Sequence, residues 1–219
     1  MQQPITLYLD GYFVNQWDGT CFVALTEKGL TFATARALLR DGQGVPTALR
    51  ELTGVAQVPA FQHGDVWLTE SSAIVEYLEE VFPPPAYPRL FPVEPRRRAR
   101  ARQVMSWLRF ELGPLRDERN WWMCVYHAMP DRPLSRAASR AAAELVELAT
   151  KAITSGDFDD WSIAHVDLAF TLLRLEHTDI VLPAPVRTFL DTAITRPSLR
   201  GYLDHPRPPN PPPASAARG

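Results

Sequence analysis

The chain contains little cysteine and little lysine. Cys21 and Cys124 are the only cysteines among 219 residues, which excludes a disulfide-dense scaffold and a cysteine-rich zinc site. Lysine occurs only at Lys28 and Lys151, so 21 of the 23 basic residues are arginine. The formal net charge of -2 excludes a globally basic nucleic-acid-binding protein.

Long apolar runs are also absent from the sequence. No run approaches the ~20 residues that a membrane-spanning helix needs, so we expect no membrane segment. Residues 1–12 contain no basic stretch that leads into an apolar one, so we expect no signal peptide. Hydrophobic residues make up 46% and charged residues 22%, a balance that is typical of a globular protein.

Proline, by contrast, is abundant and clustered. Of the 21 prolines, six lie in residues 83–95 and six in residues 206–213. Proline lacks a backbone donor and restricts the residue before it, so we interpret 83–95 as an extended linker. It separates a first domain, 1–82, from a second, 96–205. Residues 206–219 have no apolar pattern and are predicted to form a disordered tail.

The first domain alternates strand and helix signals. Short β-prone runs alternate with amphipathic segments, and Gly64-Asp65 predicts a hairpin turn. Strands are predicted at 5–9, 58–61 and 66–68, and helices at 21–27 and 71–82. Residues 30–39 could form a further strand, although residues 33–40 also have helical character. This order indicates a small mixed sheet with helices.

The second domain shows helical periodicity throughout. Four apolar stripes lie in residues 104–115, 145–153, 166–173 and 186–194. Pro114 is expected to kink the first of them. The third is apolar on most sides and is predicted to be the buried central helix.

Four local motifs then sharpen the interpretation. They are Val58-Pro59, the segment Leu68-Thr-Glu-Ser-Ser-Ala-Ile-Val-Glu-Tyr-Leu78, the segment Ile163-Ala-His-Val-Asp-Leu-Ala169, and Arg196-Pro-Ser198. With the proline-rich linker, they make residues 5–203 resemble the cytosolic glutathione transferases. Residues 23–30 and 98–103 are most similar to a bacterial branch of that family, the YfcF type.

This resemblance implies an α/β plus all-α architecture. A thioredoxin-like domain of order β-α-β-α-β-β-α would precede a helical bundle. It also implies a cytoplasmic homodimer that uses glutathione as cosubstrate and needs no metal. The other partner would be a small hydrophobic second substrate, with no nucleic acid and no membrane.

The resemblance also implies a glutathione site. Pro59 would follow a cis peptide bond, and the backbone of Val58 would pair with the cysteinyl unit like an added strand. Glu70 would face the γ-glutamyl ammonium, and Ser71 would bind a carboxylate at a helix N-terminus. Gln57 would reach the glycyl end. The alternative is that Glu70-Ser71 is only a helix start.

The expected catalytic hydroxyl is missing. Where the resembled branch has Ser-Pro after an aromatic pair, this chain has Asn15-Gln16. The Asn15 amide supplies two donors, so we interpret Asn15 as the partner of the glutathione thiolate. The alternative is a turn or N-cap residue, and Tyr12 is a second candidate for the thiolate.

Aromatic residues suggest a wall for the second substrate. Trp121, Trp122 and Tyr126 fall within six residues, in a region that lines the substrate pocket in the resembled family, and Tyr12 could join them. Core packing is the alternative. Adjacent helical residues diverge by ~100°, so at least one of the two tryptophans should face a cleft or a partner subunit.

Several other residues favour a structural interpretation. His165 stands where the family has an acid in a capping box with Ser162, and Asp167 is expected to take over part of that role. Cys21 and Cys124 are interpreted as small buried hydrophobes rather than redox thiols. The arginine-rich segment 96–102 could bind nucleic acid, but a solvated helix face is favoured.

The sequence therefore predicts a glutathione-dependent transferase, peroxidase or disulfide reductase. Its substrates would be small hydrophobic electrophiles, hydroperoxides or mixed disulfides. The alternative is a non-catalytic binding or interaction protein with the glutathione-transferase fold, in which the loss of Ser-Pro marks a loss of thiol activation.

Overall fold

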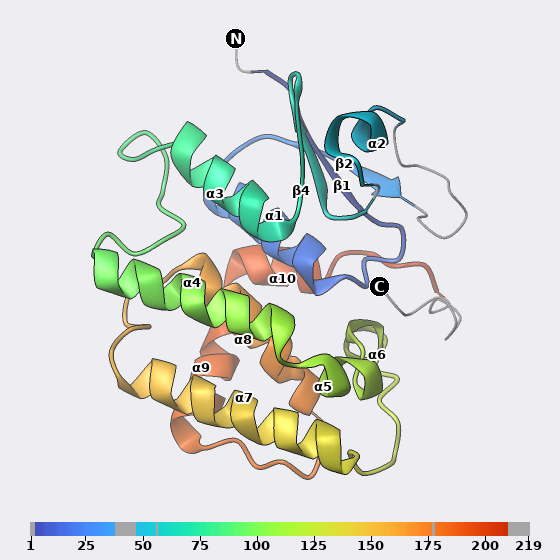
Figure 1. Cartoon of the computed structure of the whole chain (residues 1–219), viewed down its shortest axis with the longest axis vertical. Helices are drawn as coiled ribbons and strands as arrows, with labels where there is room; N and C mark the ends of the chain where they lie inside the picture. The colour runs from blue at the N-terminus through green and yellow to red at the C-terminus, as the bar shows by residue number, and fades with distance from the viewer. Residues whose placement is uncertain (1–2, 38–46, 56, 177, 210–219) are drawn as a thin grey trace. The chain divides into compact units, whose positions relative to one another are not determined.

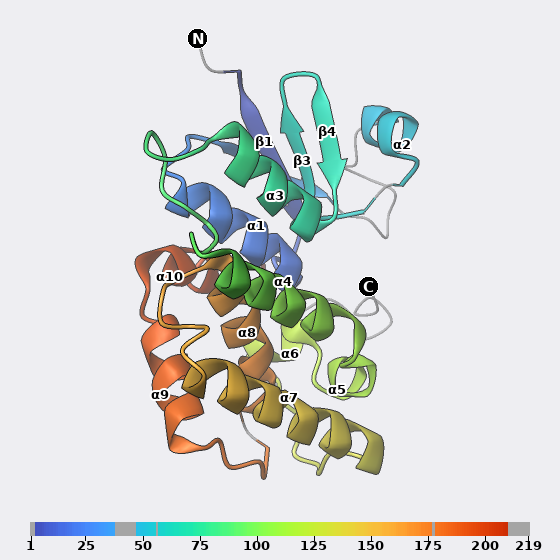
Figure 2. The same ribbon diagram turned by 60° about the vertical axis from the view of Figure 1, so that its left-hand side comes forward.

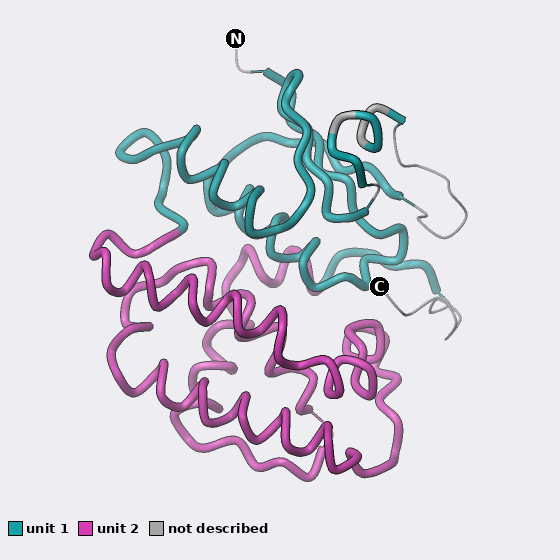
Figure 3. Tube along the Cα trace, in the orientation of Figure 1, with its two compact units in different colours: residues 1–90, 204–210 teal, residues 91–203, 211–219 magenta. Residues whose placement is uncertain are grey.

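The chain divides into two compact units. The computed structural model describes residues 3–37, 47–55, 57–176 and 178–209. Unit 1 comprises residues 1–90 and 204–210, and unit 2 comprises residues 91–203 and 211–219 (Figure 3). The boundary after Leu90 falls inside the predicted linker. Most of the predicted tail, residues 210–219, lies outside the described residues.

Unit 1 is built on a four-stranded sheet of order β2-β1-β3-β4. The strands are β1 (Ile5–Asp10), β2 (Ala33–Ala37), β3 (Ala60–His63) and β4 (Val66–Thr69). β1 pairs in parallel with β2 and antiparallel with β3, and β3 and β4 form a hairpin. The tight turn between them uses Gly64, whose φ of 61° is readily adopted by glycine.

Three helices cover this sheet. α1 (Gln16–Glu27) and α3 (Ser71–Val81) pack against each other on one face, and α2 (Thr47–Thr53) lies on the other (Figures 1 and 2). The order of elements confirms the predicted thioredoxin-like arrangement. α1 begins five residues before the predicted start because Asn15 caps it. The prediction started at Cys21 because it relied on the apolar run at 21–25.

The core of unit 1 lies between the sheet and the α1–α3 pair. Alternate residues of β1 point into it, as the period of two in a strand requires: Ile5, Leu7 and Leu9 are buried, whereas the residues between them are half-exposed. Ile74 and Leu78 of α3 are also fully buried. This packing fixes the register of β1, so its last residue and the loop before α1 have a defined position.

Unit 2 is helical throughout (Figure 1). Its described helices are α4 (Pro95–Phe110), α5 (Gly113–Glu118), α6 (Trp121–Val125), α7 (Arg136–Thr154), α8 (Ile163–Leu172), the 3-10 turn η1 (Leu173–Leu175), α9 (Ala184–Ala193) and α10 (Pro197–Leu203). α8 is buried almost all round and contacts both α4 and α9, which confirms the prediction of a central helix. No helix in the described residues is long and apolar enough to cross a membrane.

Three boundaries differ from the sequence-based expectation. Pro114 does not kink one helix but helps to start a new one: α4 ends at Phe110, and Pro114 is in the first turn of α5, where its missing N–H costs nothing. Pro95 belongs to α4 rather than to the linker, because the Glu94 side chain caps that helix. Arg207 contacts Phe13, so the predicted tail does not begin at residue 206.

His165 replaces the acid of the expected capping box. Its Nδ1 accepts a hydrogen bond from the Ser162 amide at 3.2 Å, and its Nε2 lies 3.1 Å from the Phe158 carbonyl oxygen. A neutral imidazole with its proton on Nε2 satisfies both contacts. The Asp167 carboxylate binds Arg109 at 2.6 Å and joins α8 to α4, and its expected part in the capping stays a prediction.

Candidate functional site

Asn15 occupies the N-cap of α1. Its Oδ1 accepts a hydrogen bond from the Trp17 amide at 3.0 Å, and its Nδ2 donates to the carbonyl oxygen of Val58 at 3.1 Å. The capping role that the sequence left open for Asn15 is therefore present. The second contact adds something that the sequence does not reveal: Asn15 joins the start of α1 to the segment that leads into β3.

Val58 precedes Pro59 through a cis peptide bond, as the resemblance implied. Val58 is half-buried and lies two residues before β3 begins at Ala60. Its carbonyl oxygen is already paired with Asn15. Among the described residues, the Val58 amide N–H has no hydrogen-bond partner. It is therefore available as a donor to an extended ligand.

Glu70 has an unusual backbone conformation. Its φ of 66° and ψ of 112° lie in a region that is costly for a residue with a side chain, and such residues cluster at ligand-binding sites. Glu70 is the N-cap residue of α3 but makes no side-chain capping bond. Its exposed carboxylate is instead contacted by Gln57 Nε2. A plain helix start would not need this conformation.

Ser71 follows as the first residue of α3 and is buried. Thus the structure brings four predicted residues into two contacting pairs, Asn15 with Val58 and Gln57 with Glu70, and places Ser71 directly after the second pair. Asn15 and Val58 lie 43 positions apart in the sequence, and they meet because β1, which precedes Asn15, pairs with β3, which follows Val58. The exposed backbone amides at the start of a helix favour a carboxylate.

Asp18 is a buried carboxyl group that sequence analysis missed. Its Oδ2 accepts a hydrogen bond from the Asp10 amide at 2.6 Å, and its Oδ1 is buried with no partner among the described residues. Burial raises the pKa of Asp18 well above its usual value, and the Asp10 amide offsets only part of this. The signal was present in the sequence, since an acid three residues after a capping Asn falls in the first helical turn.

Tyr12 lies in the loop between β1 and α1. It is half-exposed, and its backbone amide donates to the Asp10 carboxylate at 2.9 Å. This bond orders the loop before Asn15. Its role as a thiolate partner or as part of the substrate pocket stays a prediction.

The other predicted pocket residues lie in unit 2. Trp121 is buried against Phe170 of α8, with ring centroids 5.0 Å apart, so it takes the core-packing role that the sequence left open. Trp122 and Tyr126 are half-exposed on α6 and just after it. The two adjacent tryptophans therefore differ in burial, and the exposure of one of them to a cleft or a partner subunit stays a prediction. Of the three predicted pocket residues in unit 2, only Trp122 and Tyr126 therefore remain as candidates.

Neither cysteine has the surroundings of a reactive thiol. Cys21 is fully buried in α1. Burial raises the pKa of Cys124 to about 11, although the Arg174 charge opposes this. A thiol with a raised pKa is a poor nucleophile at neutral pH.

The arginine-rich segment of α4 is largely paired inside unit 2. Arg97 binds Asp160 at 2.7 Å, and Arg98 donates to the carbonyl oxygens of Pro92 and Val93. Arg100 donates to Gln103. These contacts support the interpretation of a solvated helix face.

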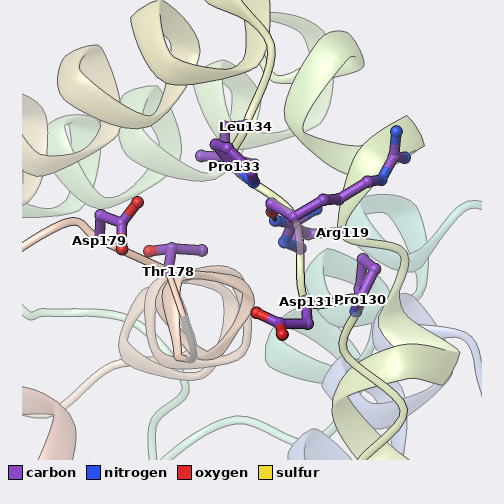
Figure 4. Close-up of a pocket in the computed structure, with 8 residues that line it drawn as sticks. Arg119, Pro130, Asp131, Pro133, Leu134, Thr178 and Asp179 are labelled. Carbon is purple, nitrogen blue, oxygen red and sulfur yellow. Dashed lines mark hydrogen bonds between the residues drawn. The ribbon is translucent and has the colours of Figure 1, made fainter.

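A small cleft in unit 2 is separate from all the predicted site residues. It has a volume of about 140 Å³. Figure 4 shows Thr178 and Asp179 facing the segment that carries Pro133 and Leu134, with Asp131 at one end. Basic and acidic side chains both line it, since Arg119 also contributes. Elsewhere, the described ranges hold no group of three or more side chains suited to a metal ion.

Comparison with known proteins assigns the family. Residues 19–81 match the model of the glutathione S-transferase N-terminal domain, and residues 94–200 match that of the glutathione S-transferase C-terminal domain. Together these cover more than half of the chain. The protein belongs to the glutathione S-transferase family.

Individual relatives agree with this assignment. A crystal structure of a glutathione transferase homolog from Burkholderia GL BGR1, with bound glutathione, shares 33% identity at a TM-score of 0.73; the match covers 92% of this chain and 97% of that one. The chain is 31% identical over 133 residues to a stringent starvation protein A homolog from Histophilus somni, covering 61% of this chain and 55% of the relative. It is 32% identical over 111 residues to maleylacetoacetate isomerase from Mus musculus, covering 50% of each. The chain thus spans only about half the length of these curated relatives.

Proposed function

We propose that this protein binds glutathione in unit 1 and transfers it to, or uses it to reduce, a small hydrophobic substrate. The second substrate would be an electrophile, a hydroperoxide or a mixed disulfide. Val58 would pair with the cysteinyl unit, Glu70 would face the γ-glutamyl ammonium, Ser71 would bind a carboxylate, and Gln57 would reach the glycyl end. Membership of the family supports a cytoplasmic homodimer.

The observation that carries this proposal is the pairing of Asn15 with Val58 beside the unusual backbone of Glu70. Three chain segments contribute polar groups to one small region of unit 1. A homologue that is matched over nearly its whole length contains glutathione. Asn15 would hold the thiolate through its amide, and catalysis would rest on proximity and on thiolate stabilisation.

A second candidate function is binding without catalysis. It is favoured by the Asn15 side chain, which already caps α1 and holds the Val58 carbonyl oxygen. Both contacts are structural and neither needs a thiolate. The two candidates differ in one property, the pKa of the bound glutathione thiol.

Ultraviolet titration of bound glutathione tests the role of Asn15. In the wild-type protein we expect the thiol pKa to fall about one to two units below its free value of ~8.5. Asn15→Ser retains both an N-cap acceptor and a donor, so its thiol pKa should stay lowered. Asn15→Asp also retains the cap but cannot donate and adds a negative charge, so the pKa should return to the free value or rise above it.

The Ser and Asp variants form a matched pair, because both residues cap helices well. Because aspartate, unlike serine, cannot donate to the Val58 carbonyl oxygen, the unfolding curves of the two variants are compared as well. With equal stability, a difference in thiol pKa reports on the thiol rather than on folding. An unlowered thiol pKa in the wild-type protein, measured with glutathione demonstrably bound, would exclude the catalytic proposal and leave the binding protein. Failure of the wild type to bind glutathione would exclude both.

Glu70→Gln should weaken glutathione binding by about tenfold to a hundredfold, because a hydrogen bond to a charged group is worth ~1.5–3 kcal/mol. The variant keeps the length of the side chain and its contact with Gln57. Calorimetric titration would measure the affinity, with the exposed Glu80→Gln on the same helix as the control. Glutathione without its amino group should bind both proteins equally weakly. A wild-type protein that does not discriminate between the two ligands would contradict the role of Glu70.

A further inference from the structure

The segment after α10 returns to unit 1 and contacts the loop before Asn15. His205 stacks on the ring of Phe13, with centroids 4.1 Å apart and planes inclined by 29°. Arg207 Nε lies 3.4 Å from the Phe13 carbonyl oxygen, and its Nη1 donates to the His205 carbonyl oxygen at 3.1 Å. These contacts join residues about 190 positions apart.

Phe13, in the loop between β1 and α1, has an unusual backbone conformation. Its φ is 55°, a left-handed conformation that is rare for a bulky side chain and persists only where the surroundings impose it. Its amide donates to the Asp10 carbonyl oxygen at 2.9 Å, and its ring is almost fully buried. Asn15 follows only two residues later, so a change at Phe13 is transmitted to the helix cap.

Phe13 is held from β2 as well as from the C-terminal segment. The Arg36 guanidinium lies 5.3 Å from the centre of its ring. The His205 ring also makes an edge contact with the Phe22 ring of α1, with ring centroids 6.2 Å apart. The C-terminal segment therefore bridges the loop and the helix that the loop precedes.

The charges around His205 favour stacking. Partial burial lowers the pKa of His205, and the positive charges of Arg207 and Arg36 lower it further. The imidazole is thus neutral at neutral pH. A neutral ring stacks on Phe13 without competing with Arg36 for the ring as a second cation.

We propose that the segment 204–207 is a positioning strap, in which His205 and Arg207 hold Phe13 and so fix Asn15 at the start of α1. His205 and Arg207 are positioning residues rather than catalytic ones, since they act through Phe13. Their effect on glutathione rests on the proposed function of Asn15. Their effect on the loop does not, because it concerns contacts within unit 1 alone.

Hydrogen exchange of the protein without glutathione tests the strap directly. In His205→Ala, peptides covering residues 11–20 should exchange about tenfold faster, because the loop opens more often when one wall of Phe13 is removed. His205→Tyr keeps an aromatic ring that can stack on Phe13, so exchange should stay as slow as in the wild type. Pro209→Ala, at an exposed position beyond the strap, should leave exchange unchanged.

Two outcomes would overturn the proposal. One is unchanged exchange of residues 11–20 in both His205→Ala and Arg207→Ala. The other is acceleration spread evenly over unit 1, or not rescued by His205→Tyr, which would indicate general destabilisation instead. Should His205→Ala not fold, Arg207→Ala and His205→Tyr still decide the matter, since each leaves part of the strap intact.

A second readout connects the strap to the chemistry. The bound glutathione thiol pKa should rise toward its free value in His205→Ala and return in His205→Tyr. Faster exchange combined with an unlowered thiol pKa in the wild type would uphold the strap and exclude the catalytic role of Asn15. A lowered wild-type pKa with unchanged exchange in both His205→Ala and Arg207→Ala would exclude the strap and leave the role of Asn15 in place.

Discussion

Replacing Lys28 with alanine is expected to lower the free energy of unfolding by about 3 kcal/mol, because removal of one partner leaves a poorly solvated charge. Lys28 Nζ lies 2.6 Å from Glu79 Oε2 and donates to the Phe82 carbonyl oxygen at 2.8 Å. The Lys28 side chain is fully buried, and only 16% of the Glu79 side chain is exposed. The same carboxylate accepts a bond from the Leu90 amide. One ion pair thus joins the end of α1 to the end of α3 and to the chain beyond it.

The chain contains its own control for this substitution. Lys151, the other lysine, is exposed on α7, and Lys151→Ala should change stability by no more than about 0.5 kcal/mol. Equilibrium denaturation followed by circular dichroism would measure both variants. The paired variant Lys28→Met with Glu79→Gln should recover part of the loss, because it removes both charges while the glutamine oxygen can still accept from the Leu90 amide. An effect of Lys28→Ala as small as that of Lys151→Ala would contradict the role of the ion pair.

Mild acid is expected to destabilise unit 2 through His165. Burial lowers the pKa of this imidazole to about 4 from 6.5. A proton on Nδ1 would meet the Ser162 amide donor, so the folded state resists protonation while the unfolded state accepts it. The stability that depends on neutral His165 is complete above pH 6.5 and is lost as the pH falls toward 4. The full loss is about 3 kcal/mol, since each unit between the two pKa values corresponds to ~1.4 kcal/mol.

His165→Gln isolates this effect. Glutamine can accept from the N-cap amide but does not titrate, so the variant should lose the part of the acid sensitivity that comes from His165. The effect of His165 is the difference in stability between the wild type and His165→Gln at each pH. The wild type alone does not show it, because the raised pKa of Asp18 favours folding at low pH and so opposes the effect of His165. Denaturation measured at several pH values between 7 and 4 would show the difference. Parallel stability curves for the two proteins would contradict the assignment.

Much of the fold was predictable because local chemistry and tertiary packing agree. Alternation along β1, the turn at Gly64 and the helical period of α3 and α8 each follow from short stretches of sequence. The predicted helix boundaries were wrong where a polar side chain or a proline, rather than the apolar pattern, decides where a helix starts. Asn15 starts α1 before its apolar run begins, and Pro114 separates two helices rather than bending one.

The candidate site was predictable only in part. The residue types and the spacing of Val58-Pro59 from Glu70-Ser71 carry the resemblance to the family. They do not reveal that Asn15 bonds the Val58 carbonyl oxygen, because that contact depends on how β3 packs beside β1. The sequence places Asp18 in the first turn of α1, but its bond from the Asp10 amide is a tertiary contact that the local pattern does not show.

The amino-acid sequence alone predicted two domains, a small mixed sheet followed by helices, because these depend on periodicity and prolines. Its short motifs carried the resemblance to the family, which the match to the family models then confirmed. Tertiary structure decided which residues of the site meet and what holds them there. The Lys28–Glu79 pair, the Asn15–Val58 bond and the strap of His205 on Phe13 each join residues more than 40 positions apart. Such contacts exist only once the core has packed, so no local pattern could have predicted them.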